Sequence, residues 1–311
     1  MTKVVVSEYL PDVYLALLRS RYDLVYDPDL HGDRPRLLAE LADAEAVLIR
    51  NRTRIDDELV GAAPQMRVVG RLGVGLDNID LEVCDRARVK VIPAVGANAV
   101  SVAEYVIGAM LVLMRGVYGM TPSMIAGEWP RQGHAFGREL SGKTLGLVGL
   151  GSIAREVATR AAGFGMMIVA HDPFLADDEP AWRTVGTRDL PTLFIESDVI
   201  SIHVPLNDQT RNLVDGAALE RMKPTALLIN TSRGGTVDEA ALASALSRGG
   251  IAGAALDVFE SEPLGPEPAA TFAGLPNLIL TPHVAGNTDE SVDRVARMIV
   301  EAVIDALDAG S

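Results

Sequence analysis

Short β-rich runs alternate with helix-like stretches along almost the whole chain, and this alternation limits the folds that are open to it. In the first part, the β-rich runs cover residues 4–7, 24–26, 46–49, 67–69 and 90–92. Helix-like stretches lie between them, near residues 11–20, 34–43, 56–63 and 80–88. Strands that are separated by helices form βαβ units, and these build a parallel sheet covered by helices on both faces.

The alternation restarts after a long helix, which indicates two α/β domains. Residues 101–104, Ser-Val-Ala-Glu, have the pattern of a capping box and precede an apolar run to Met114. Further strands are predicted near residues 144–149, 166–171, 198–202, 225–230, 253–257 and 278–280. Residues 287–308 predict one amphipathic helix. We expect the chain to cross between the domains near residues 97–101 and 286–287.

Composition excludes several classes of protein. A chain of 311 residues with 48% hydrophobic and 23% charged residues is typical of a globular protein with two domains. No apolar stretch approaches the ~20 residues that span a bilayer, so no membrane partner is expected. The formal charge of −14 argues against nucleic acid as a partner. The single cysteine, Cys84, fits a reducing cytoplasm, and no Cys/His/Asp spacing resembles a metal site.

A glycine-rich turn predicts a dinucleotide site. The strand near residues 144–149 leads into Gly149-Leu-Gly151-Ser152-Ile153-Ala154 and then into a helix. Gly149 permits the tight turn, Gly151 lets the backbone approach a pyrophosphate, and the helix N-terminus supplies N–H groups to the anion. The next strand ends in Asp172, where a ribose-binding carboxylate is expected, so the sequence favours NAD over NADP. Tight packing for the glycines and strand-end capping for Asp172 are the simpler alternatives.

Three polar residues follow predicted strands in the same half of the chain. Arg233, Glu262 and His283 come after the strands near residues 225–230, 253–257 and 278–280. Ligands of parallel sheets bind at the carboxyl ends of the strands. An arginine can grip a carboxylate, a histidine can move the hydroxyl proton, and a glutamate can orient the imidazole and favour its protonated form. The three residues predict hydride transfer at a 2-hydroxy acid.

Seven stretches in the same order resemble the D-2-hydroxyacid dehydrogenases of the phosphoglycerate dehydrogenase type. They are residues 71–80, 101–104, 149–154, 203–206, 230–235, 257–263 and 281–286. The resemblance extends over essentially the whole chain. There are two departures, because the third glycine of the turn is Ala154 and because the chain ends at Ser311. The second departure predicts that the regulatory domains of longer phosphoglycerate dehydrogenases, and serine feedback through them, are lacking.

The resemblance implies an α/β fold with two Rossmann-like domains and parallel sheets. A discontinuous substrate-binding domain would comprise residues 1–98 and 287–311, completed by the C-terminal helix, and an NAD-binding domain residues 99–286. A homodimer would form through the cofactor domains. Arg233, Glu262 and His283 would take the three catalytic roles, and the backbone of Gly73, Val74 and Gly75 would bind the substrate carboxylate. The cofactor site would be lined by Val102, Gly149, Gly151, Ser152, Ile153, Asp172, His203, Pro205, Thr210, Thr231, Arg233, Asp257, His283, Ala285 and Gly286.

The substrate is expected to be a small anionic 2-hydroxy or 2-keto acid, and three arginines bear on its identity. Arg50, Arg52 and Arg71 follow strands of the first domain, where they are expected to bind an anion at carbon 3. The first expectation is therefore 3-phosphoglycerate, with 3-sulfolactate as a close alternative. The arginines could instead pair with Asp56, Asp57 or Asp80, which would leave a generalist hydroxypyruvate or glyoxylate reductase. An NAD-sensing scaffold that binds partner proteins is a remote alternative, and His134 is a further candidate for substrate contact.

Overall fold

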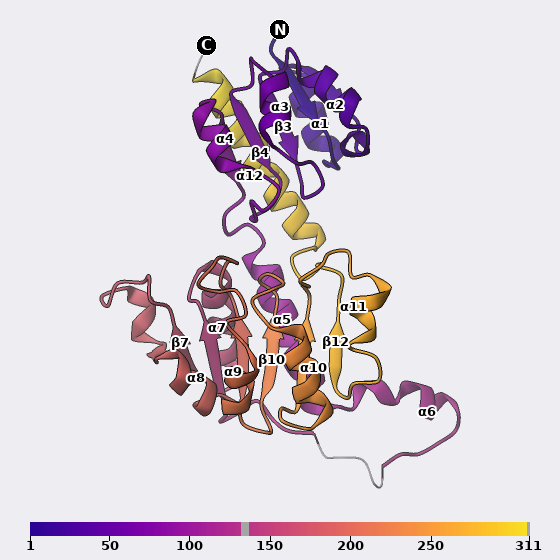
Figure 1. Cartoon of the computed structure of the whole chain (residues 1–311), viewed down its shortest axis with the longest axis vertical. Coiled ribbons are helices and arrows are strands. Elements are labelled where there is room, and N and C mark those ends of the chain that lie inside the picture. Colours follow the sequence, from indigo (N-terminus) through magenta and orange to yellow (C-terminus); the bar gives the residue numbers. More distant parts are fainter. Residues whose placement is uncertain (132–136, 310–311) are drawn as a thin grey trace. The chain divides into compact units, whose positions relative to one another are not determined.

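The structure is a computed structural model, and it describes residues 1–131 and 137–309. The chain divides into two compact units. Unit 1 comprises residues 1–98 together with residues 287–311, and unit 2 comprises residues 99–286. Each unit contains one parallel sheet with helices against it, so the α/β class predicted from the sequence is confirmed (Figure 1).

Unit 1 has a five-stranded parallel sheet in the order β2-β1-β3-β4-β5. Its strands are β1 (Lys3–Val6), β2 (Asp23–Tyr26), β3 (Ala46–Ile49), β4 (Val68–Arg71) and β5 (Lys90–Pro93). Its helices are α1 (Asp12–Arg19), η1 (Leu30–Gly32), α2 (Arg34–Leu41), α3 (Asp57–Ala62), α4 (Leu81–Arg86) and α12 (Asp289–Asp308). The strand order reverses between β1 and β3, which is the point where ligands of such sheets bind.

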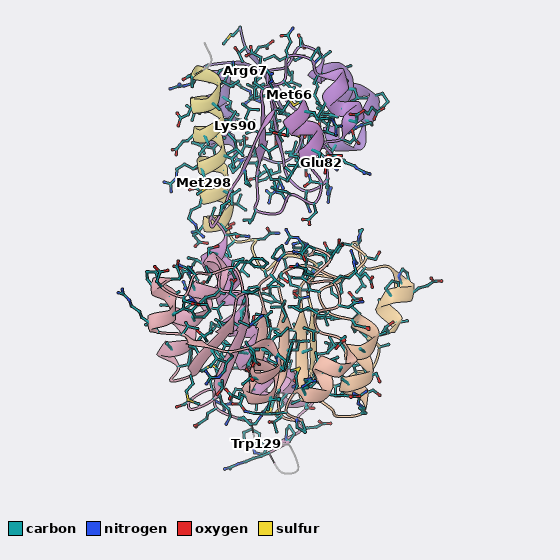
Figure 2. The ribbon with its side chains drawn as sticks, turned by 60° about the vertical axis from the view of Figure 1, so that its left-hand side comes forward. Met66, Arg67, Glu82, Lys90, Trp129 and Met298 are labelled. Atoms are coloured by element: carbon teal, nitrogen blue, oxygen red, sulfur yellow. The ribbon has the colours of Figure 1, made fainter. Side chains whose placement is uncertain are left out.

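Helix α12 completes the core of unit 1, although about 200 residues separate it from β5 in the sequence. Its apolar stripe, which includes Ile299 and Val303, is fully buried against the sheet. Gly70 in β4 allows this close packing, because a Cβ at that position would lie 2.8 Å from methyl groups of both residues. The neighbouring Met298 lies on the exposed side of the helix (Figure 2). The expectation that the C-terminal helix packs on the first domain is thus confirmed.

Unit 2 has a seven-stranded parallel sheet in the order β12-β11-β10-β9-β6-β7-β8. Its strands are β6 (Thr144–Val148), β7 (Met167–His171), β8 (Gly186–Thr187), β9 (Val199–Ile202), β10 (Leu227–Asn230), β11 (Gly253–Leu256) and β12 (Leu278–Leu280). Its helices are α5 (Ala99–Arg115), η2 (Tyr118–Met120), α6 (Thr121–Ile125), α7 (Ser152–Gly163), η3 (Pro180–Arg183), α8 (Leu190–Glu196), α9 (Gly216–Arg221), α10 (Glu239–Ser247) and α11 (Pro266–Ala270).

The central strands of unit 2 are buried on both faces. In β10, Leu227 and Ile229 face the core formed with α5 and α7, whereas Leu228 faces the core formed with α8, α9 and α10. A strand that is buried on both faces has a continuous apolar sequence, and for this reason β10 could be predicted from the sequence. The order of the strands reverses between β6 and β9, as in a dinucleotide-binding sheet.

The sequence predicted the start of α5 incorrectly. The helix begins at Ala99, so Ser101 lies inside its first turn, buried, and does not cap it. No single helix among the described residues is long and apolar enough to span a membrane. Together, α5 and the helical segment Tyr118–Ile125 have the length and the apolar composition of a membrane span. However, the two helices are bent by 69° relative to each other, and α5 is a buried core helix.

A segment of unit 2 extends away from its sheet. It contains η2, α6 and the residues up to Trp129 (Figure 1). Trp129 lies at its outer end (Figure 2) and is 74% exposed. Tyr118 and Ile125 on the same segment are also exposed, so these three large apolar side chains of the segment face solvent.

Candidate functional site

Six strand ends of the unit 2 sheet carry the residues that the sequence singled out. All strands of this sheet are parallel, so their carboxyl ends lie at one edge. Along this edge the residues are Asp172 after β7, Gly149 after β6, His203 after β9, Arg233 beyond β10, Asp257 after β11 and His283 beyond β12. The sheet therefore brings them to a common edge around the switch point between β6 and β9.

The glycine-rich turn connects β6 to α7. Gly149 has a φ of +88°, and a Cβ there would lie 2.7 Å from the carbonyl oxygen of His203. Gly151 has an ordinary φ of −75°, and a Cβ there would meet nothing within 4 Å. Folding therefore requires a glycine at position 149, whereas at position 151 the protein itself leaves open space.

That open space lies at the N-terminus of α7. Gly151 is the N-cap residue, and no side chain caps the helix. Ser152 and Ile153 begin the helix, so their N–H groups belong to the first turn, which has no intrahelical acceptors. An uncapped helix N-terminus next to a glycine that the protein does not otherwise need fits the pyrophosphate of a dinucleotide.

Asp172 lies beside this turn. One carboxylate oxygen accepts a hydrogen bond from the N–H of Leu150 at 2.9 Å, and the other accepts from the N–H of Phe174 at 3.0 Å. The side chain is partly exposed, so acceptor capacity remains for another partner. Asp172 thus has the position and the chemistry of a group that binds ribose hydroxyls.

Arg233 extends from a tight turn that follows β10. The side chain of Asn230 organises this turn, because it donates to the carbonyl of Arg233 and accepts from the N–H and hydroxyl of Ser232. At Gly234 a Cβ would overlap the carbonyl group of Phe259, so the turn packs directly on the loop that follows β11. The guanidinium is half-buried and donates to the carbonyl of Ser232 at 2.6 Å.

Glu262 and His283 form a hydrogen-bonded pair. Nδ1 of His283 lies 2.7 Å from Oε2 of Glu262, while Oε1 accepts from the N–H of Phe259 at 3.1 Å. Burial alone would raise the pKa of Glu262, but the bonds from His283 and Phe259 and the charge of Arg233 together lower it. An ionised Glu262 accepts the proton of Nδ1, and this leaves Nε2 of His283 available for chemistry.

The Asp257 carboxylate lies beneath the turn that carries His283. It is 1% exposed and accepts hydrogen bonds from the hydroxyl of Thr281 and from the N–H groups of Val284 and Ala285. These three bonds leave it little capacity for another ligand. In the structure its side chain supports the 283–286 turn, and the cofactor contact that the resemblance implies for Asp257 stays a prediction.

The other expected cofactor residues differ in exposure. Val102 and Ala285 are buried, and Thr210 holds the turn after β9 by donating to the carbonyl of Pro205 at 2.6 Å. Burial lowers the pKa of His203 to about 4, so its ring is neutral near pH 7, and its Nε2 lies 2.9 Å from the hydroxyl of Ser201. The hydroxyl of Thr231 is buried without a hydrogen-bond partner among the described residues. A buried hydroxyl of this kind is costly unless a ligand satisfies it.

In unit 1, the sequence missed the residue that organises the loop after β3. Glu8 is 4% exposed, and its carboxylate accepts from the backbone N–H groups of Arg50, Arg52 and Thr53. The only sequence signal was an acidic residue directly after an apolar strand. The side chain of Arg52 is exposed, with Nη1 3.4 Å from Nε2 of His31.

Within the described residues, neither Arg50 nor Arg52 has an ion pair. Asp56 pairs with Arg34 and Arg54, Asp57 pairs with Arg86, and Asp80 caps α4. The structure therefore does not support the alternative that these carboxylates form ion pairs with Arg50 and Arg52. Both guanidinium groups remain candidates for binding an anion.

Arg71, the last residue of β4, is buried in unit 1. It is 9% exposed, and its guanidinium donates to the carbonyls of Gly75 and Leu72 at 2.8 and 2.9 Å. At Gly73 a Cβ would overlap this guanidinium. Arg71 therefore supports the loop of Gly73, Val74 and Gly75 from within, and its expected contact with an anion at carbon 3 stays a prediction. His134 lies outside the described residues.

Comparisons with known proteins agree on one family. A family model described as "D-isomer specific 2-hydroxyacid dehydrogenase, NAD binding domain" matches residues 107–285. The (S)-sulfolactate dehydrogenase of Chromohalobacter salexigens is 49% identical over 99% of both chains. The D-3-phosphoglycerate dehydrogenase of Archaeoglobus fulgidus is 36% identical over 97% of this chain, which spans 56% of that relative's length. Among solved structures, the D-lactate dehydrogenase of Aquifex aeolicus complexed with NAD and lactic acid matches with a TM-score of 0.85. Its sequence is 29% identical, over 99% of this chain and 96% of that one.

Proposed function

The chain belongs to the D-isomer specific 2-hydroxyacid dehydrogenases, and from this premise we propose that it interconverts 3-sulfolactate and 3-sulfopyruvate with NAD. Its enzyme class is that of an NAD-dependent oxidoreductase acting on a CH–OH group. The observation that carries the choice of substrate is the 49% identity to an (S)-sulfolactate dehydrogenase over the full length of both chains. The comparisons favour this substrate over 3-phosphoglycerate, the first expectation from the sequence.

The arrangement in unit 2 supports a division of roles among three side chains. Bound NADH supplies the hydride that reduces carbon 2 of the keto acid. Arg233 binds the substrate carboxylate through its planar guanidinium and polarises the carbonyl group. His283 donates the proton of Nε2 to the carbonyl oxygen, which becomes the hydroxyl, and in the reverse direction it accepts that proton. Glu262 keeps the ring oriented and stabilises its protonated form through Nδ1.

Unit 1 supplies the proposed anion selectivity. Arg50 and Arg52 follow β3, and the Glu8 carboxylate fixes their backbone, so the loop is ordered before any ligand binds. A sulfonate at carbon 3 presents three oxygens that match guanidinium donors. The backbone N–H groups of Gly73, Val74 and Gly75 complete the proposal as donors to the substrate carboxylate, on the loop that Arg71 supports.

A homodimer and a cytoplasmic location are further parts of the proposal. The exposed side chains of Tyr118, Ile125 and Trp129 support a dimer formed through unit 2, because an apolar segment that extends from a unit is stabilised when a second copy covers it. Multi-angle light scattering of the wild type and of Trp129→Glu tests the dimer. The location follows from the single, buried cysteine, Cys84.

The test of the substrate compares 3-sulfopyruvate, 3-phosphohydroxypyruvate, hydroxypyruvate and pyruvate as acceptors of hydride from NADH, followed by absorbance. We expect kcat/KM to be highest for 3-sulfopyruvate. Arg52→Ala should lower the preference for 3-sulfopyruvate over pyruvate by roughly 10- to 150-fold, the equivalent of about 1.5–3 kcal/mol for one charge-assisted hydrogen bond. The matched control is Arg54→Ala, two residues away, whose side chain is exposed and lies 3.9 Å from Asp56.

Three outcomes would contradict the proposal in different ways. A preference for 3-phosphohydroxypyruvate would indicate that the substrate is 3-phosphoglycerate, as first expected from the sequence. Equal losses on all four acids in Arg52→Ala would indicate a generalist reductase. The absence of turnover on every acid, together with tight NADH binding, would support the scaffold alternative.

A further inference from the structure

A tyrosine in the interior of α5 connects to the turn that carries His283. The hydroxyl of Tyr105 lies 2.6 Å from Oγ1 of Thr281, and Oγ1 of Thr281 lies 2.6 Å from Oδ1 of Asp257. Tyr105 lies in the apolar run for which the sequence predicts a long helix. Thr281 follows β12 directly, so the contact ties a core helix to the end of an edge strand.

The direction of the two hydrogen bonds follows from the chemistry of the groups. An ionised carboxylate can only accept, so the hydroxyl proton of Thr281 is donated to Asp257. Thr281 has no second proton, and it must therefore accept from Tyr105. Burial and the charge of Asp257 raise the pKa of Tyr105, although the bond to Thr281 opposes them, so the phenol keeps the proton that it donates.

Asp257 fixes the backbone on both sides of His283. Its carbonyl accepts from the N–H of His283 at 2.8 Å, and its carboxylate accepts from the N–H groups of Val284 and Ala285 at 2.9 and 2.8 Å. His283 has a φ of +57°, in the left-handed region that residues with a side chain seldom adopt. Such a conformation persists only where the surrounding structure holds it.

We propose that Tyr105 and Thr281 are positioning residues, which hold the left-handed His283 turn in place through the carboxylate of Asp257. The chain of donors ends on a buried carboxylate that also binds the N–H groups of Val284 and Ala285 in this turn. The inference rests on the proposed function for the catalytic role of His283. It goes beyond that function because neither Tyr105 nor Thr281 is one of the three proposed catalytic residues, and Thr281 reaches His283 only through its carbonyl, which lies 3.0 Å from the backbone nitrogen of His283.

The test uses the full-length protein and four variants. The relay consists of the hydrogen bonds from Tyr105 to Thr281 and from Thr281 to Asp257. Tyr105→Phe removes only the hydroxyl of Tyr105. Thr281→Val removes the hydroxyl that links the two bonds at nearly constant volume, and Thr281→Ser restores that hydroxyl. Tyr14→Phe is the matched control, because it removes a tyrosine–carboxylate hydrogen bond of 2.8 Å to Asp293 in unit 1. Two kinds of measurement are made on each variant. Mass spectrometry gives the amide exchange rates of residues 284 and 285, and binding and steady-state kinetics give the Kd for NADH and the kcat and KM for the best keto acid.

We expect faster exchange at residues 284 and 285 in Tyr105→Phe and Thr281→Val, but not in the control. In Tyr105→Phe, kcat should fall about 2- to 12-fold, the equivalent of one ordinary hydrogen bond. In Thr281→Val it should fall further, on the order of 10- to 100-fold, as for a catalytic group displaced by up to about 1 Å. The KM and the Kd for NADH should change less than about twofold, and Thr281→Ser should recover most of kcat.

Three results would overturn the inference. Unchanged exchange in both Tyr105→Phe and Thr281→Val would show that the turn does not depend on the relay. Faster exchange with unchanged kcat would leave the relay with a merely structural task. A Thr281→Ser variant as slow as Thr281→Val would assign the effect to the lost methyl group. If the wild type reduces no 2-keto acid, the proposed function has failed, and the exchange rates still decide whether the relay holds the turn.

Discussion

At Arg233 we expect the planar shape of the guanidinium to matter more than its charge. The side chain extends from a turn that Asn230 orders and that packs on the loop after β11, so its origin is fixed. A point ammonium on a flexible stem cannot span a carboxylate and a carbonyl together. We therefore expect Arg233→Lys to lose nearly as much kcat/KM as Arg233→Ala, on the order of 10²-fold or more.

The matched control for Arg233→Lys is Arg248→Lys. Arg248 lies at the end of α10 in the same unit, where its guanidinium donates to the hydroxyl of Ser244 at 3.1 Å and lies 3.9 Å from Glu220. Steady-state kinetics of the four variants, Arg248→Ala included, provide the measurement. A lysine at position 233 that retained most activity would assign Arg233 to the structure of the turn.

The pair of Glu262 and His283 predicts a pH dependence. The pKa of Glu262 is lowered in the folded protein, so the carboxylate stays ionised, and the stabilisation of the pair is lost only as pH falls through that lowered pKa. In Glu262→Gln the imidazolium loses its ionic partner. We expect the alkaline limb of the pH profile for keto-acid reduction to move to lower pH, with kcat reduced on the order of 10-fold. The exposed Glu260, two residues away, provides the control Glu260→Gln.

At the scale of the strand–turn–helix element, the two glycines of the cofactor turn are predicted to separate folding from binding. Gly149→Ala combines a positive φ with a Cβ at 2.7 Å from a carbonyl oxygen, so the free energy of unfolding should fall by about 1–3 kcal/mol. Gly151→Ala meets only open space, so stability should be nearly unchanged, while the Kd for NADH rises on the order of tenfold.

Urea unfolding and NADH fluorescence titration of both glycine variants check this separation. Each variant is the control for the other, because they change the same turn by the same group. Equal losses of stability in the two variants would mean that Gly151 also serves the fold. An unchanged affinity for NADH in Gly151→Ala would place the pyrophosphate elsewhere.

The helices and strands could be predicted from the sequence wherever their burial produces a regular pattern of apolar residues. Strands that are buried on both faces of their sheet, such as β3 and β10, have continuous apolar sequences. In α12 the apolar residues recur with a helical period. The strand β8 has two exposed residues and leaves no such trace. The order of strands within each sheet depends on packing between distant segments, and local patterns do not contain it.

Among site residues, types and positions at strand ends were predictable, but their orientation was not. Arg71 and Asp257 occupy the expected strand ends, yet Arg71 bonds to its own loop and Asp257 bonds to the turn that follows β12. Which partner a charged side chain takes is decided by donors and acceptors that only the folded chain assembles. Glu8 and Tyr105 escaped notice for the same reason, because each acts on a segment far away in the sequence.

At the scale of the whole molecule, α12 makes unit 1 depend on the end of the chain. Ile299 is fully buried between the helix and β4, and Met298 beside it is 41% exposed. Ile299→Ala should lower the free energy of unfolding of unit 1 by about 2–5 kcal/mol, since it creates a cavity against Gly70. Met298→Ala on the other side of the helix should change it by less than about 0.5 kcal/mol.

Urea unfolding followed by hydrogen exchange, which reports each unit separately, provides the measurement. Protection should fall in β1, β3 and β4, while unit 2 keeps its own protection. Equal effects of Ile299→Ala and Met298→Ala would contradict the packing of α12 against the sheet.

The position of α12 also affects the order in which the two units can fold during translation. A ribosome that has released all five strands of unit 1 must still translate residues 99–286 before the covering helix exists. At about 5–20 residues per second this interval is on the order of 10–40 s. Throughout it, the apolar face of the first sheet, including Val4, Val6 and Leu48, lacks the helix that buries it. The middle of the chain can therefore reach its final fold before the beginning does, since unit 1 is complete only after α12 has been made.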